Sequence, residues 1–178
     1  MKKFFYPLAA ALLLTFSAFT AFKAIDYKIA DGYSVKFEGD HPKKDPSGEF
    51  KGLTGKISFD PANLAASSLN ASIEVATINT GNGMKNTHAK SPMWFDAAQY
   101  PTISFVSTSI TKGDAGYIAN GKLTMHGVTK DVSIPFTFEN NVFAGTFEIN
   151  RLDYNVNVAE PDHGAAKFKV SISVPVTQ

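Results

Sequence analysis

The stretch that decides the fold is NGKLTMHGVTKDVSIPFTFE, residues Asn120 to Glu139. Apolar and polar residues alternate on both sides of a central break, as in β-strands with one face in water and the other in a core. His126 to Thr129 supplies the turn, with Gly127 free to take positive φ. The inward-facing set, extended upstream, is Tyr117, Ala119, Gly121, Leu123, Met125, Val132, Ile134, Phe136 and Phe138. The stretch predicts a β-hairpin that must pack against further strands.

The rest of the chain supplies those strands. Alternating patterns cover Ile25 to Gly39, Glu49 to Phe59, Leu69 to Val75, Pro101 to Ile110, Phe143 to Ile149 and Ala166 to Val176. With no long helical pattern between them, about eight strands pair antiparallel in a closed barrel or a two-sheet sandwich. Several strands reach roughly 30 Å at about 3.3 Å per residue, which favours the barrel. The predicted fold is all-β: an antiparallel eight-stranded, lipocalin-like barrel.

Three glycines fall on inward registers of these strands: Gly55, Gly121 and Gly145. They either leave space for a cavity or permit a close approach between backbones.

The segment from Thr80 to Tyr100 breaks the strand rhythm. A short helix is expected over Asn82 to Lys90, because Pro92 bars its continuation. The segment also carries methionine and aromatic side chains, which exposed loops seldom do. We therefore predict a lid with one or two short helices over one end of the barrel.

The N-terminus has the pattern of a secretory signal. Lys2 and Lys3 precede a mostly apolar run from Phe4 to Phe22. We expect residues 1–24 to be a signal peptide and residues 25–178 to be the exported domain, periplasmic or secreted; an uncleaved anchor is the alternative. Without Lys2, Lys3 and Lys23, 14 of the 17 basic residues remain against 16 acidic ones, a net charge of −2. Nucleic-acid binding is therefore not expected.

Catalysis and metal binding find little support in the sequence. There is no cysteine, and the four histidines lie on separate segments without a paired spacing, so neither a metal site nor a cofactor is expected. No catalytic residue is assigned. The alternative is a hydrolase or metal-dependent enzyme that uses His88, His126 and the loop carboxylates Asp153, Glu160 and Asp162.

The strongest functional feature is the aromatic content, with 15 Phe, 6 Tyr and one Trp. Many of the Phe side chains face inward, where they either fill the barrel or line an apolar ligand pocket beneath the lid. We favour the pocket. Its candidate ligand-binding residues are Phe37, Leu53, Ile57, Ile73, Met84, Lys85, Asn86, His88, Met93, Trp94, Phe95, Ile103, Phe105, Leu123, Met125, Phe136 and Phe147.

Two motifs resemble a known family. GKLTMHGVTKDV at Gly121 to Val132, preceded by FDAAQYPTISF at Phe95 to Phe105, is similar to the YceI-like, lipocalin-like, polyisoprenoid-binding proteins. The similarity extends, in looser form, to Asp31 to Phe37, and it includes Gly55 to Asp60 and Asn150-Arg151-x-Asp153-Tyr154. The resemblance implies an exported, non-enzymatic barrel that carries a long isoprenoid or quinone-like lipid.

The chain departs from that family where the ligand's head group would lie. Lys85-Asn86-Thr87-His88-Ala89 stands where the family often has R-D-x-H-L, and Tyr33 stands where histidine is common. Lys85, Asn86 and His88 are our candidates for the polar anchor. Transient membrane contact during ligand loading and a homodimer are both left open.

Overall fold

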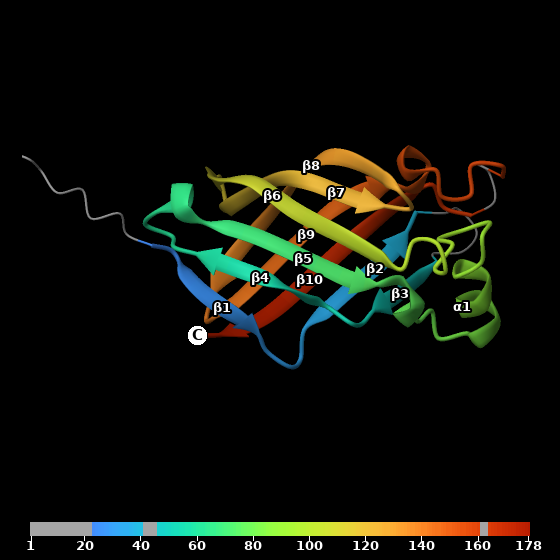
Figure 1. Cartoon of the computed structure of the whole chain (residues 1–178), viewed down its shortest axis with the longest axis horizontal. Helices are drawn as coiled ribbons and strands as arrows, with labels where there is room; N and C mark the ends of the chain where they lie inside the picture. The colour runs from blue at the N-terminus through green and yellow to red at the C-terminus, as the bar shows by residue number, and fades with distance from the viewer. Residues whose placement is uncertain (1–22, 41–45, 161–163) are drawn as a thin grey trace, which may run out of the picture.

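The computed structural model describes residues 23–40, 46–160 and 164–178. These residues form an elongated barrel of antiparallel strands with one α-helix at one end (Figure 1). The strands are β1 (Ile25–Ile29), β2 (Ser34–Gly39), β3 (Ser47–Phe50), β4 (Thr54–Phe59), β5 (Ser68–Glu74), β6 (Thr102–Gly113), β7 (Gly116–Met125), β8 (Val128–Glu139), β9 (Val142–Asn150) and β10 (Lys167–Thr177).

Eight of these strands close into a ring. The order is β1-β4-β5-β6-β7-β8-β9-β10, and β10 returns to β1 through the pair Lys28 and Thr177. Every pairing within the ring is antiparallel. The predicted antiparallel eight-stranded barrel is therefore confirmed.

Two of the predicted strands are each broken into two. The stretch from Ile25 to Gly39 bends at Gly32, where φ is 88°, and both halves, β1 and β2, pair with β10. The stretch from Glu49 to Phe59 bends at Gly52, where φ is 67°, and its halves β3 and β4 pair with β2 and β1. The polar–apolar alternation keeps its phase across Gly32, so it did not reveal that break. At Gly52 the phase shifts, because Phe50 and Leu53, three residues apart, both pack into the core.

The central hairpin has a tighter turn than predicted. Only His126 and Gly127 connect β7 to β8, and Val128 and Thr129 already belong to β8. Both turn residues have positive φ, 50° and 75°, as a two-residue hairpin turn with the strands' own twist requires. A side chain at Gly127 would also collide with the Tyr100 ring, which packs against this turn.

The lid segment forms α1 (Gly83–Ala89), the one α-helix of the described residues, as predicted. The Asn82 side chain caps it by accepting a hydrogen bond from the Lys85 amide at 3.1 Å. Three single 3₁₀ turns complete the elements: η1 (Leu64–Ala66), η2 (Val75–Thr77) and η3 (Arg151–Tyr154). The loop after η3 is described over residues 155–160 and 164–166, and Figure 1 places this part of it at the same end of the barrel as α1. Within the described ranges, no helix has the length and apolar character needed to cross a membrane.

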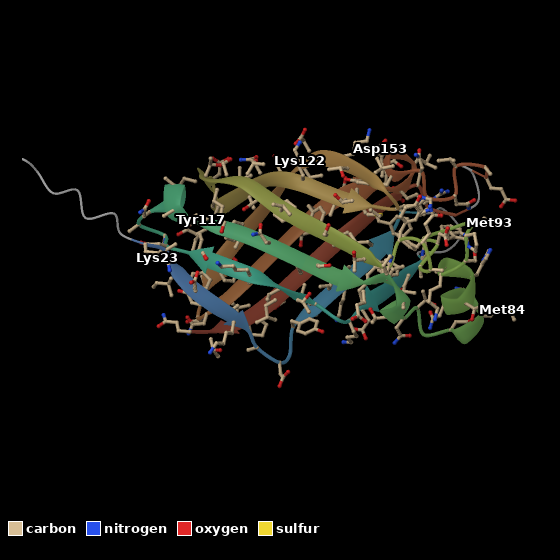
Figure 2. All side chains as sticks on the ribbon, in the orientation of Figure 1. Lys23, Met84, Met93, Tyr117, Lys122 and Asp153 are labelled. Carbon is tan, nitrogen blue, oxygen red and sulfur yellow. The ribbon has the colours of Figure 1, made fainter. Side chains whose placement is uncertain are left out.

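The opposite end of the barrel is filled by aromatic rings, which we call the aromatic plug. Phe59 is fully buried at its centre, with ring centroids 5.0 Å from Tyr117 and 5.3 Å from Phe138. Most contacts are edge-to-face, the arrangement that aromatic quadrupoles favour. The plug consists of Tyr27, Phe59, Tyr117, Phe136, Phe138 and Phe143. Figure 2 shows Tyr117 far from the lid residues Met84 and Met93.

The inward glycines belong to the packed strands and do not enlarge a cavity. A methyl group at Gly121 would run into the Val106 carbonyl oxygen and the Phe105 ring, and one at Gly145 would run into the Pro135 carbonyl oxygen. These glycines therefore permit close approach between neighbouring strands, which is the second of the two explanations given in the sequence analysis.

Candidate ligand-binding cavity

Between the aromatic plug and the lid the barrel is hollow. The cavity has a volume of about 620 Å³, within the usual range for small-molecule sites. Inward registers of β2, β5, β6, β7, β9 and β10 form its walls, and the lid and the loop after η3 contribute to its lid end. Its surface is predominantly hydrocarbon, because alternate residues on each strand are aliphatic or aromatic.

Most of the predicted ligand-binding residues line this cavity. They share either an inward strand register or the inner side of the lid. They are Phe37, Leu53, Ile73, Lys85, His88, Trp94, Phe95, Ile103, Phe105, Leu123, Met125 and Phe147. Their contact with a ligand stays a prediction.

Five predicted residues do not line the cavity. Ile57 is buried in packed core and Phe136 belongs to the aromatic plug, because the inward face of a strand continues past the hollow part of the barrel. On the lid, Met84 and Met93 point into solvent, 84% and 49% exposed. Asn86 has a structural role: its Oδ1 accepts hydrogen bonds from the Thr80 amide at 2.8 Å and the Thr80 hydroxyl at 2.7 Å.

Sequence reasoning did not predict that η3 and the loop after it line the lid end of the cavity. Arg151, Val156, Gly164 and Ala165 all line the cavity, although none of them is among the candidate ligand-binding residues predicted from the sequence. The available signal was the Asn150-Arg151-x-Asp153-Tyr154 motif, which marks a constrained turn.

Arg151 organises that loop from inside. Its side chain is only 2% exposed, and it donates from Nε to the Ala165 carbonyl at 2.8 Å and from Nη1 to the carbonyls of Val156 and Asn157 at 2.6 and 2.9 Å. Burial lowers the pKa of the guanidinium from its usual value. These bonds fold the loop back over the cavity, so Arg151 acts on the shape of the site.

Trp94 joins the loop to the lid. The Arg151 guanidinium lies 5.2 Å from the centre of the Trp94 ring. The His88 ring packs edge-to-face against the same tryptophan, with 6.0 Å between ring centroids. Trp94 also lies against Gly164. Because Trp94 lines the cavity and is the only tryptophan in the chain, its fluorescence reports on the occupancy of the site.

The residues of the enzymatic alternative are not brought together in the cavity. His126 packs edge-to-face against Tyr100, with 4.6 Å between ring centroids, and does not line the cavity, whereas His88 does. Asp153 and Glu160 are also absent from its walls, and Asp162 lies outside the described residues. Across the described part of the chain, no three His, Asp or Glu side chains are arranged to hold a metal ion.

A closed antiparallel barrel with an apolar interior, a lid at one end and a packed opposite end is the architecture of a lipocalin-like protein. Residues 27–177 match the model of the YceI-like domain. The chain belongs to the YceI-like family, as the two sequence motifs indicated.

Relatives and solved structures agree with this assignment. A UPF0312 protein of Vibrio cholerae is 31% identical over 163 residues, which cover 85% of this chain and 86% of the relative. The crystal structure of Burkholderia cenocepacia BcnA is similar with a TM-score of 0.75 and 30% identity, covering 82% of this chain and 96% of that one. A polyisoprenoid-binding domain from Saccharophagus degradans shares the fold, with a TM-score of 0.61, 16% identity and coverage of 83% and 95%.

Proposed function

We propose that the protein is a non-enzymatic carrier of a long apolar lipid, such as a polyisoprenoid or a prenyl-quinone, held in the barrel without covalent chemistry. The observation that carries the proposal is the cavity of about 620 Å³ with hydrocarbon walls. A member of the same fold is described as polyisoprenoid-binding, which supports this ligand class.

The size of the cavity sets a scale for the ligand. At about 30 Å³ for each water-sized group, 620 Å³ accommodates about twenty methylene-sized groups. Burying each contributes about 0.8 kcal/mol, or on the order of 15 kcal/mol in total before the costs of association and chain ordering. After these costs, enough of the gain remains for tight binding.

The aromatic plug also gives the bound lipid a direction. Because the rings of Phe59 and its neighbours fill one end, the apolar tail would point toward the plug and the head group toward the lid. A carrier of this kind recognises the tail by burial and the head by contacts at the lid end.

Extraction of the protein purified from its native host tests the proposal. We expect native mass spectrometry and solvent extraction to find one lipid class bound in near-stoichiometric amounts. The stripped protein should then bind all-trans-retinol, with quenching of Trp94 fluorescence. No co-purifying lipid together with no retinol binding would refute the carrier function.

We further propose that the carrier is exported and exchanges its lipid at a membrane surface. The signal pattern supports export; residues 1–22 lie outside the described residues. Three exposed apolar side chains, Met84, Met93 and Val158, belong to the lid and to the loop after η3, the two segments that bound the lid end of the cavity. Apolar side chains at this end would let a lipid pass between bilayer and barrel without crossing water.

A further inference from the structure

The ionisable residues that line the cavity all have basic side chains. Among the described lining residues there are Lys36, Lys85, His88 and Arg151, and neither Asp nor Glu occurs. A site for a wholly uncharged lipid has no need of this bias, since charges near an apolar wall are costly unless they are solvated or paired.

The four basic residues have different roles. Lys36 lies between Val35 and Phe37, whose side chains face inward, so its own side chain has an outward register. Arg151 already donates to backbone carbonyls of the loop after η3. Lys85 and His88 remain, one helical turn apart on α1 and both exposed at the lid end.

Lys85 is the group best suited to a ligand. Of the ion pairs found among the described residues, none involves the Lys85 ammonium group. The helix cap at Asn82 binds only the Lys85 backbone amide. A solvated ammonium at the rim of an apolar cavity favours a negatively charged partner, because a charge-assisted hydrogen bond is stronger than a neutral one.

We infer that the carried lipid is an acidic amphiphile, with a carboxylate or phosphate head group held at Lys85 and His88 and its tail in the barrel. This inference rests on the proposed carrier function and specifies the ligand that the carrier selects. The head group would lie at the lid end in contact with water, where it keeps part of its hydration while the tail is buried.

A matched pair of probes separates the head group from the tail. All-trans-retinol and all-trans-retinoic acid share one isoprenoid tail and differ only in the head, and both can be followed by quenching of Trp94 fluorescence. At low salt we expect the wild-type protein to bind the acid about tenfold more tightly than the alcohol. The preference should shrink as NaCl is raised from about 10 mM to about 1 M, while the affinity for retinol stays constant.

Three variants assign the preference to one side chain. Lys85→Gln should remove most of it by weakening the binding of the acid, and Lys85→Glu should reverse it. Lys90→Gln is the control, because Lys90 follows α1 directly but does not line the cavity. Lys90→Gln should keep the full preference for the acid.

A second arm distinguishes the two acidic heads. Geranylgeranyl phosphate and geranylgeraniol compete with retinol for the wild-type protein, and stronger competition by the phosphate supports a phosphate head. Equal binding of charged and neutral probes in both arms, or a preference that survives in Lys85→Gln, would overturn the inference while leaving the carrier function intact. If none of the four probes binds, the carrier function itself fails.

Discussion

Filling the hollow part of the barrel should abolish binding without unfolding the protein. Leu123 is buried and lines the cavity, whereas Ile57 is equally buried but lies in packed core. We therefore compare Leu123→Trp with Ile57→Trp. At Leu123 the indole enters open space, so the free energy of unfolding should change by less than about 1 kcal/mol. At Ile57 the same ring must displace its neighbours, at a cost of about 1–3 kcal/mol.

The effects on binding should be the reverse. An indole at Leu123 adds about six heavy atoms and displaces a similar number of ligand groups, which at about 0.8 kcal/mol each weakens binding by about 5 kcal/mol, more than a thousandfold in Kd. Ile57→Trp should bind with unchanged Kd, since Ile57 does not line the cavity.

Two measurements on each variant check this. Urea unfolding followed by far-UV circular dichroism gives stability, and the increase in fluorescence of directly excited retinol gives Kd without interference from the new tryptophan. Ile57→Trp should also lower the Tm by about 2–12 °C. The reasoning is refuted if Leu123→Trp loses as much stability as Ile57→Trp, because the space at Leu123 would then be filled, or if it still binds retinol normally.

The remaining predictions concern the plug, the loop after η3 and the lid. Phe59→Ala should lower the free energy of unfolding by about 4 kcal/mol in urea, because Phe59 is enclosed by other rings. Phe105→Ala should cost clearly less, because the Phe105 ring borders the cavity. Equal losses would contradict a filled end of the barrel. Burial, with a smaller contribution from Asp153, raises the pKa of the Tyr154 phenol above its ordinary value of about 10. The protonated phenol therefore contributes stability that is fully present below about pH 10. This contribution is lost as the pH rises through the pKa of Tyr154 in the folded protein. Tyr154→Phe should therefore lose less stability than wild type between about pH 8 and pH 11 in urea titrations, and an identical loss would show that Tyr154 does not control the alkaline limit. Replacing both Met84 and Met93 by Ser should slow retinol transfer from phosphatidylglycerol vesicles. Val106 is 52% exposed on the wall of the barrel, and Val106→Ser should leave the rate of transfer unchanged. Equal slowing by the two changes would argue against membrane contact through the lid.

The strand pattern predicted the barrel because a period of two is a property of the backbone. The alternation around Leu123 and Ile134 identifies an inward face wherever it occurs, and eight such segments with no long helices leave few closed arrangements. The same rule could not locate the bend at Gly32, because a glycine with positive φ interrupts the strand there without disturbing the alternation around it. At Gly52 the alternation does change phase, since Phe50 and Leu53 both face inward.

On the lid the sequence predicted the helix correctly but neither its cap, Asn82, nor the direction of each side chain. Met84 and Lys85 are neighbours, yet only Lys85 lines the cavity, because consecutive residues of a helix differ by about 100° in direction. Asn86 was predicted as an anchor for a ligand, and its amide oxygen is instead satisfied by Thr80 within the same segment. A short polar side chain beside a turn most often bonds to nearby backbone, and only coordinates show which partner it takes.

Whether an inward residue faces a ligand or another ring depends on its height along the barrel axis, which an alternating pattern does not contain. Phe105 and Phe136 both occupy inward registers of long strands, but Phe105 borders the cavity and Phe136 lies within the plug. The division arises because aromatic residues from β1, β4, β7, β8 and β9 pack against one another at one end and fill it, whereas the other half is lined by a mixture of aliphatic and aromatic residues, such as Ile73, Leu123 and Phe147, that leaves a cavity. A barrel built in this way has a single apolar compartment with one end sealed by rings and the other bounded by a lid that bears Lys85. In the proposed carrier, the orientation of a bound lipid would therefore follow from the end that the rings fill, and the selection of its head group from the short helix at the opposite end.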